Sequence, residues 1–314
     1  MKSKLRIVFM GTPDFATHSL KLLVESGYNV VGVITAPDKP SGRGQKMSFS
    51  SVKEYALLKN LHLMQPKNLK DEGFINELKS LKVDVQIVVA FRMLPELVWS
   101  IPTKGTLNLH ASLLPKYRGA APINWAIING ENESGVSTFF IEKEIDTGNI
   151  ILQEKVSIGP DENAGHLHDK LMEIGAKLVC ETIDKIDSGK IEAKAQNGTI
   201  TQAPKIFKKD CKIDWNDSLI NIHNFIRGLS PYPSAWTFID EELNQSLKIF
   251  KSSVIESAHS EGIGKITVDE NNTLKVAVKG GYIQLHEIQL SGRKKMKTED
   301  FLRGYQFAKN TILK

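Results

Sequence analysis

Residues 5–35 read LRIVFMGTPDFATHSLKLLVESGYNVVGVIT, and their pattern decides the fold of the first half of the chain. The apolar run from Leu5 to Met10 is typical of a buried parallel strand. A turn at 11–14 leads into an amphipathic helix at 15–26, and residues 29–35 predict a second strand. Strand, turn, helix and strand make a βαβ unit, so we expect a Rossmann-like α/β domain. The turn lacks the full G-x-G-x-x-G pattern, which argues against dinucleotide binding.

A strand that opens into a loop follows at 105–125, where the sequence reads GTLNLHASLLPKYRGAAPINW. Two leucines alternate with Asn108 and His110, so the amide and the imidazole point to the same side, one pleat apart. Two prolines and a glycine then interrupt regular structure. Reactive groups in α/β sheets usually lie at the carboxyl ends of strands, facing such loops.

A carboxylate completes a possible reactive set 36 residues after His110 (146 minus 110), at Asp146 in the turn Asp-Thr-Gly. Together the three residues supply an oxyanion donor, a proton-transfer group and a carboxylate that orients the imidazole. The alternative is a structural polar pair at a strand end, with the histidine bonded to a backbone carbonyl. The order of the three residues favours the catalytic interpretation.

These motifs resemble the signature of folate-dependent formyltransferases, with Asn108-Leu-His110-Ala-Ser112-Leu-Leu-Pro115 and Tyr117-Arg118-Gly119 followed by Asp146-Thr147-Gly148. The resemblance implies acyl transfer from 10-formyltetrahydrofolate, with Asn108, His110 and Asp146 as catalytic residues. It also implies a folate pocket lined by Ser112, Leu113, Leu114 and Pro115. A related segment lines the pterin pocket in the family, but here it reads Phe91-Arg92-Met93-Leu94-Pro95, a departure from the usual Tyr-Gly. No metal ligands converge, and the reaction needs none.

The segment 36–48, APDKPSGRGQKMS, carries two prolines, two glycines and three basic residues. This composition predicts an exposed, mobile, cationic loop without helix or strand. It is either a solvated linker or a finger that contacts phosphates through Arg43 and Lys46. Within the family, members that act on methionyl-tRNA carry a similar Pro-Asp-(Lys/Arg)-Pro-x-Gly-Arg-Gly loop.

The last third of the chain has a different pattern. After a helix predicted at 213–229, five short strands at 235–240, 246–253, 265–268, 273–278 and 281–290 predict a small OB-like β-barrel. A helix is predicted at 298–306. Residues 204–314 hold 17 basic and 13 acidic side chains, so +4 of the formal net charge of +5 lies there. The densest basic patch of this region includes Arg293, Lys294 and Lys295, and it is either a solvated face or a nucleic-acid contact that neutralises phosphates. The resemblance implies that the nucleic acid is tRNA.

A length of 314 residues suits two domains, and we expect a catalytic domain at 1–189, a linker at 190–206 and a tRNA-binding barrel at 207–314. The two cysteines, Cys180 and Cys211, form neither a zinc motif nor a disulfide framework. No run of about 20 apolar residues and no signal peptide is present, so we expect a cytoplasmic protein, and a monomer.

The reactive set leaves the acceptor open. A sugar amine or a purine precursor would use the same three residues, and so would water in a formyltetrahydrofolate hydrolase. A non-catalytic RNA-binding protein is a further alternative, against which the intact set argues. The loop at Arg43 and the basic barrel favour initiator methionyl-tRNA as the partner.

Overall fold

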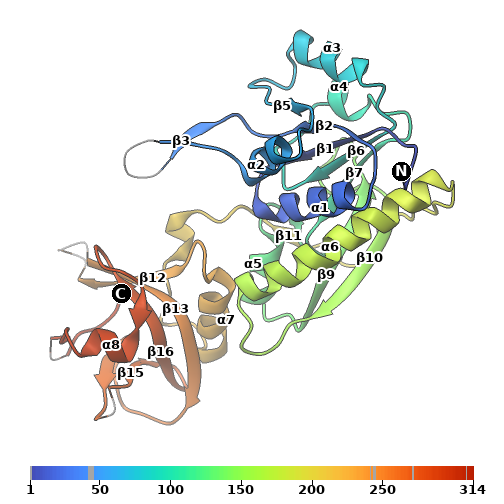
Figure 1. Ribbon diagram of the computed structural model, residues 1–314. Helices are drawn as coiled ribbons and strands as arrows, with labels where there is room; N and C mark the ends of the chain where they lie inside the picture. Colours follow the sequence, from blue (N-terminus) through green and yellow to red (C-terminus); the bar gives the residue numbers. More distant parts are fainter. Residues whose placement is uncertain (1, 42–45, 241, 243–244, 271, 309) are drawn as a thin grey trace. The chain divides into compact units, whose positions relative to one another are not determined.

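The computed structural model describes residues 2–41, 46–240, 242, 245–270, 272–308 and 310–314 (Figure 1). The chain divides into two compact units, and each draws on separate stretches of sequence. Unit 1 comprises Met1–Gly119, Ser134–Val156 and His168–Gln202. Unit 2 comprises Ala120–Glu133, Ser157–Leu167 and Ala203–Lys314.

Unit 1 is built around a seven-stranded sheet with the order β10-β9-β7-β6-β1-β2-β5. The strands are β1 (Ile7–Gly11), β2 (Val30–Ile34), β5 (Leu63–Met64), β6 (Val85–Val89), β7 (Thr106–His110), β9 (Glu133–Phe140) and β10 (Ile150–Ser157). From β5 to β7 all neighbours are parallel, whereas β9 runs antiparallel to β7. The chain leaves β1 first toward β2 and β5, and later toward β7, so the strand order reverses between β1 and β6. Ligands bind at this kind of switch point, outside the carboxyl ends of the strands.

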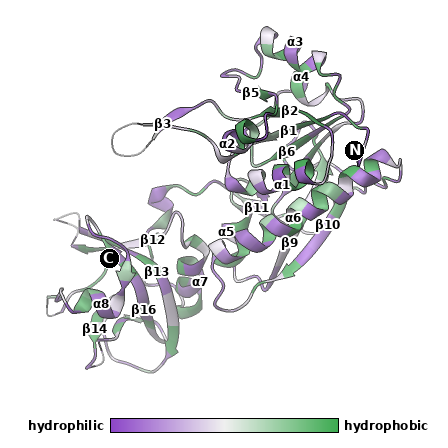
Figure 2. Ribbon diagram, viewed as in Figure 1, coloured by the Kyte–Doolittle hydropathy of each residue, from purple (hydrophilic) through white to green (hydrophobic). Residues whose placement is uncertain are grey.

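The helices of unit 1 bury their apolar stripes against this sheet. They are α1 (Asp14–Glu25), α2 (Ser51–Leu58), α3 (Glu72–Ser80), α4 (Glu96–Trp99) and the long α6 (Ala164–Asp187), whose first turn belongs to unit 2. Figure 2 shows the polar and apolar sides of α6. A Cβ on Gly175 would lie 2.9 Å from Leu109 Cδ2, so this helix packs closely on β7. A Cβ on Gly11 would lie 2.5 Å from that of Ala16, so only glycine allows α1 its approach to β1.

Two short two-stranded ribbons are separate from the main sheets. One pairs β8 (Arg118–Gly119) with β11 (Gln202–Ala203), and the other pairs β3 (Lys39–Ser41) with β4 (Lys46–Ser48). The second ribbon shows that the prediction of no strand in 36–48 was wrong. Pro40 pairs with Met47 in an isolated two-stranded ribbon, where each strand is an edge and the missing N–H of a proline is tolerated.

Unit 2 contains an antiparallel sheet with the order β12-β13-β16-β15-β14, and β17 pairs with β16. Its elements are α5 (Pro122–Ile128), the 3-10 turn η1 (Lys208–Cys211), α7 (Leu219–Leu229), β12 (Ala235–Asp240), β13 (Gln245–Glu256), β14 (Ile266–Val268), β15 (Leu274–Val278), β16 (Gly281–Leu290), β17 (Met296–Lys297) and α8 (Thr298–Leu302). All five predicted strands are present. Helix α8 ends at Leu302, four residues earlier than predicted.

The end of the chain bridges the two edges of this curled, OB-like sheet. Leu313 N donates to Gly264 O at 2.8 Å and Ile266 N donates to Thr311 O at 3.1 Å, on the β14 side. On the β12 side, Phe238 and Lys314 exchange two backbone hydrogen bonds of 3.0 Å. Residues 311–314 therefore pair with part of each edge, which shortens the exposed edges of this curled sheet.

The helix predicted at 213–229 begins only at Leu219, so its first turn and a half was predicted wrongly. Side chains explain the difference. Asp214 Oδ1 accepts from Asn216 N, Asp217 Oδ1 accepts from Ser218 N, and these local bonds compete with helical ones. Ser218 then caps α7, because its Oγ accepts from Asn221 N at 3.2 Å.

Candidate active site

Asn108 and His110 lie near the carboxyl end of β7, beside β6 and the switch point of the sheet. The Asn108 side chain is half-buried, and it makes no hydrogen bond to any residue that the structure describes. Its amide is therefore available to a bound ligand. An amide that donates to a developing oxyanion must have a fixed position and an N–H that no protein group already binds. A central strand fixes the position of Asn108.

His110 is buried, with 7% of its surface exposed, and both ring nitrogens face protein oxygens. Nε2 lies 2.8 Å from the carbonyl oxygen of Tyr117. A carbonyl only accepts, so Nε2 carries a proton and donates it. Nδ1 lies 3.7 Å from Asp146 Oδ2, within range of an ion pair but longer than a hydrogen bond. Nδ1 is thus the ring nitrogen that faces the carboxylate.

Asp146 occupies a tight turn between β9 and β10. Its φ is +56°, a left-handed conformation that aspartate tolerates better than most residues. Its Oδ2 accepts a 2.8 Å hydrogen bond from the backbone N–H of Gly119. Two residues later, a Cβ on Gly148 would lie 1.7 Å from the carbonyl oxygen of Phe140, so only glycine fits there. The turn and the loop after β7 therefore hold the carboxylate from both sides.

The four residues predicted to line a folate pocket lie against β9 and β10. Ser112 Oγ donates to Lys116 O at 2.6 Å, and Leu114 N donates to Ser137 Oγ at 3.1 Å. Ser112, Leu114 and Pro115 are buried, which leaves Leu113 as the most exposed of the four. These hydrogen bonds fix the shape of the loop that carries Tyr117 to His110.

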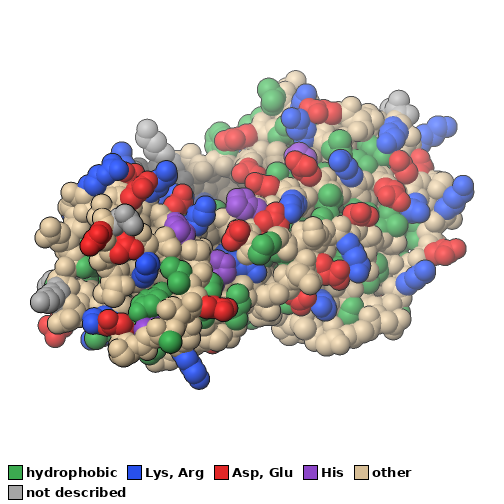
Figure 3. All heavy atoms as spheres, turned by 90° about the horizontal axis from the view of Figure 1, so that it is seen from below, with side chains coloured by type: hydrophobic (Ala, Val, Ile, Leu, Met, Phe, Trp, Pro, Cys, Tyr) green, Lys and Arg blue, Asp and Glu red, His purple; other side chains and the backbone are tan. Residues whose placement is uncertain are grey.

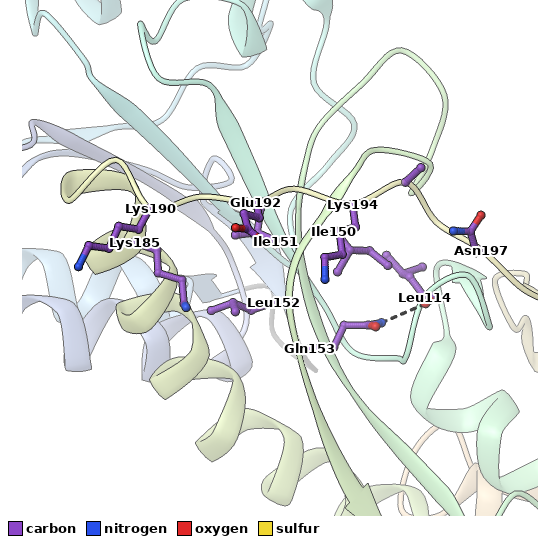
Figure 4. A pocket seen from close by; sticks show the side chains of 11 residues that line it. Leu114, Ile150, Ile151, Leu152, Gln153, Lys185, Lys190, Glu192, Lys194 and Asn197 are labelled. Carbon is purple, nitrogen blue, oxygen red and sulfur yellow. Dashed lines mark hydrogen bonds between the residues drawn. The ribbon is translucent and has the colours of Figure 1, made fainter.

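A cavity of about 620 Å³ opens beside β10, between that strand, the end of α6 and residues 190–197 (Figure 4). Leu114 lines it, and Gln153 reaches across from β10 to donate to the Leu114 carbonyl. Lys185, Lys190 and Lys194 contribute positive charge. None of Asn108, His110 and Asp146 lines this cavity, so it is separate from the reactive set.

Of the two predicted phosphate contacts in the first loop, Arg43 lies outside the described residues. Lys46 begins β4, and its side chain also lies outside them. The base of this hairpin is held firmly. Asp38 Oδ2 accepts from Lys53 Nζ at 2.5 Å, and Gln65 Nε2 donates both to Asp38 Oδ1 and to Ala36 O, at 2.9 Å each.

The three basic residues predicted on the barrel differ in their surroundings. Arg293 lies over the rings of Phe301 and Tyr305, at 5.9 and 5.5 Å from their centres. Lys295 Nζ is 2.8 Å from Glu287 Oε2, so part of its charge is already neutralised. Lys294 is exposed and has no ion pair within the described part of the chain. The face drawn in Figure 3 intersperses basic and acidic side chains rather than presenting one sign.

Sequence analysis missed Gln196 and Thr201, which form hydrogen bonds to the loop after β7. Both residues lie in the stretch 190–206, which was predicted to be a linker. Thr201 Oγ1 accepts from Tyr117 N at 2.7 Å, and Thr201 O accepts from Arg118 N at 3.0 Å. Gln196 bonds both to the Arg118 side chain and to the Asp146 turn. The stretch shows no periodicity, so no local signal marked these two residues.

Comparison with known proteins agrees with this geometry. Residues 5–183 match the formyl transferase family, and residues 205–306 match the formyl transferase C-terminal domain family. The chain belongs to the formyl transferase family. The methionyl-tRNA formyltransferase of Bacteroides thetaiotaomicron is 52% identical over 98% of this chain and 98% of its own length. That of Flavobacterium johnsoniae is 54% identical over 97% and 98%. The resemblance inferred from the motifs and the predicted two-part fold are confirmed.

Two solved structures share the fold at low sequence identity. An N-formyltransferase from Helicobacter canadensis, in complex with folinic acid and dTDP-3-aminofucose, has a TM-score of 0.60 at 22% identity and covers 93% of this chain and 100% of its own. HypX from Aquifex aeolicus, in complex with tetrahydrofolic acid, has a TM-score of 0.64 at 16% identity and covers 98% and 51%. Folate derivatives are thus bound by proteins of this fold.

Two further features bear on the site. Across the described residues, no three histidine, cysteine, aspartate or glutamate side chains are grouped to hold a metal ion. None of the described helices is both long and apolar enough to cross a membrane.

Proposed function

We propose that this formyl transferase moves the formyl group of 10-formyltetrahydrofolate to the α-amine of methionine on initiator tRNA, for translation initiation. The observation that carries the proposal is the identity of 52 to 55% with methionyl-tRNA formyltransferases along nearly the whole chain, both units included. Residues 1–189 carry the chemistry in this proposal, 190–206 link, and 207–314 bind tRNA as part of a monomer.

Asn108 and His110 act on the tetrahedral intermediate. The methionine amine, whose pKa is about 8 in a free α-amine, is partly neutral near pH 7 and attacks the formyl carbon. Asn108 donates its free amide N–H to the oxyanion that forms. His110 donates a proton from Nδ1 to the departing folate nitrogen as the carbon–nitrogen bond breaks. The attacking amine in turn gives one proton to His110 Nδ1, which restores the imidazolium, so the transfer is balanced.

Asp146 orients the imidazole in this scheme. The 3.7 Å gap to His110 Nδ1 lets the carboxylate stabilise an imidazolium without locking the ring away from the substrate. Ser112, Leu113, Leu114 and Pro115 would border the donor, with Leu113 as the most accessible contact. No metal is required, because the oxyanion is met by hydrogen-bond donors.

For the tRNA, the contacts proposed are phosphate contacts by Arg43 and Lys46 in the first loop and by Arg293, Lys294 and Lys295 on the barrel. Such contacts bind the backbone without reading sequence, and they weaken as salt rises. Among the three barrel residues, Lys294 should contribute most to phosphate binding, because it is exposed and has no ion pair within the described residues.

The proposal is tested by giving the purified protein 10-formyltetrahydrofolate with one acceptor at a time: methionyl initiator tRNA, uncharged tRNA, a nucleotide-linked amino sugar, or none. Formylation of methionyl initiator tRNA alone is expected. Formylation of the amino sugar would assign the chain to a different acceptor. Donor breakdown without any acceptor would indicate a hydrolase, and tRNA binding without formyl transfer would indicate an RNA-binding protein.

A further inference from the structure

Gln196 connects two parts of the site that the sequence keeps far apart. Its Nε2 donates to the carbonyl oxygens of Asp146 at 2.8 Å and Gly148 at 2.9 Å. Its Oε1 accepts from the Arg118 side chain, at 2.7 Å from Nη2 and 3.1 Å from Nε. One amide thus uses both of its donor protons and both of its acceptor sites.

The partners of Gln196 belong to the two segments that place the catalytic pair. Arg118 lies between Tyr117, whose carbonyl binds His110, and Gly119, whose N–H binds the Asp146 carboxylate. The turn that contains Asp146 is the other segment. Residues 117–119 contact both the His110 imidazole and the Asp146 carboxylate. Gln196 adds a second connection, between Arg118 and the backbone of the Asp146 turn.

The conformation of the turn explains why it needs such support. Asp146 has a φ of +56°, which costs free energy for any residue with a Cβ, and such conformations persist only where surrounding contacts over-determine them. The side chain of Asp146 already receives one hydrogen bond, from Gly119. Gln196 fixes the backbone of the same residue, so the carboxylate is held at both its oxygen and its main chain.

We propose that Gln196 is a positioning residue that sets the distance between Asp146 and His110 by binding the Asp146 turn to Arg118. It touches no reacting atom. It acts only through the carboxylate, and so this inference rests on the proposed roles of Asp146 and His110. Residues 196–201, within the proposed linker, then also support the catalytic residues.

Two substitutions distinguish the hydrogen bonds that the Gln196 amide donates from those that it accepts. Gln196→Met keeps the size of the side chain and removes all four contacts. Gln196→Glu keeps the acceptor for Arg118 but removes both donors to the turn. Gln202→Met is the matched control, because Gln202 lies in the same segment, is exposed, and makes no side-chain hydrogen bond in the described structure.

Formyl transfer to methionyl initiator tRNA is measured first with the wild-type protein, because its absence would refute the proposed function and not this inference. With an active wild type, both Gln196 variants should lose about ten- to thirty-fold in kcat, because both lose the two hydrogen bonds that Gln196 donates to the Asp146 turn, and two ordinary hydrogen bonds account for about that factor. KM for donor and tRNA should stay within about two-fold. Gln202→Met should match the wild type.

A double-mutant cycle decides whether the effect passes through Asp146. In an Asp146→Ala background, Gln196→Met should cost less than about three-fold, because the carboxylate that it positions is gone. A full additional loss there would overturn the proposal, as would a Gln196→Glu variant with wild-type kcat. The Glu variant keeps a polar side chain and its Arg118 contact, so it serves if the Met variant does not fold.

Discussion

Gly148→Ala should disable catalysis without altering any reactive side chain. The added Cβ would lie 1.7 Å from the carbonyl oxygen of Phe140, where a separation below 3.0 Å is essentially never seen. One of the two must move by at least the difference, 1.3 Å. Phe140 belongs to β9, which is hydrogen-bonded between β7 and β10, so the turn is the part that moves.

A shift of this size reaches Asp146, two residues earlier in the same turn. Its 2.8 Å bond to Gly119 N would be stretched beyond hydrogen-bond range. A misplacement of about 1 Å can cost on the order of 10²-fold in rate, so we expect kcat to fall by about that factor. KM should change little, since neither the loop at 36–48 nor the barrel is touched.

The assay is steady-state formylation of methionyl initiator tRNA, with thermal unfolding of each variant as the check on folding. Gly262→Ala is the matched control: its Cβ would meet nothing within 4 Å, and it should keep wild-type kcat. Asp146→Asn removes the negative charge with a residue type that tolerates the left-handed conformation, and it should lose a similar factor. A folded Gly148→Ala protein with kcat within three-fold of wild type would refute the role assigned to this turn.

Four further outcomes are expected. Asn108→Ala should lower kcat by about 10²-fold or more while donor binding persists in a binding titration, because one oxyanion donor is lost; activity within a few-fold would contradict this role. Lys294→Ala should reduce the salt dependence of tRNA binding more than Lys295→Ala, whose lysine is paired with Glu287; equal salt slopes would argue otherwise. Leu313→Ala should destabilise the barrel by about 2–5 kcal/mol in urea unfolding, because Leu313 is buried where the chain end bridges the two edges of the sheet; a wild-type midpoint would contradict that role. Burial lowers the pKa of His223, so below about pH 6.5 the unfolded state binds more protons and stability falls as the pH drops. His223→Gln should weaken this pH dependence in urea unfolding at pH 7.5 and 5.5, and an unchanged dependence would exclude His223 as its source.

The local pattern of apolar and turn residues was enough to predict most helices and strands. The βαβ unit at 5–35, the strands of the barrel and the long helix α6 depend on periods of two or 3.6 residues and on turn residues, which are readable in a single segment. The same period of two placed Asn108 and His110 on one side of β7. Errors arose where local side-chain bonds delayed a helix, at Asp214 and Asp217, and where two short edges of a ribbon paired despite a proline, at Pro40.

The catalytic framework was only partly predictable. The sequence by itself predicted Asn108, His110 and Asp146 as the catalytic set, because their residue types and order resemble those of formyltransferases. The tertiary structure alone decided how they are held. The carbonyl of Tyr117 accepts a hydrogen bond from one ring nitrogen of His110, and Gln196 connects the Asp146 turn to Arg118, which lies 78 residues before Gln196 in the sequence. Such contacts depend on which segments the folded sheet brings together. The stretch that contains Gln196 has no periodic pattern, so its sequence does not indicate which distant segment it contacts.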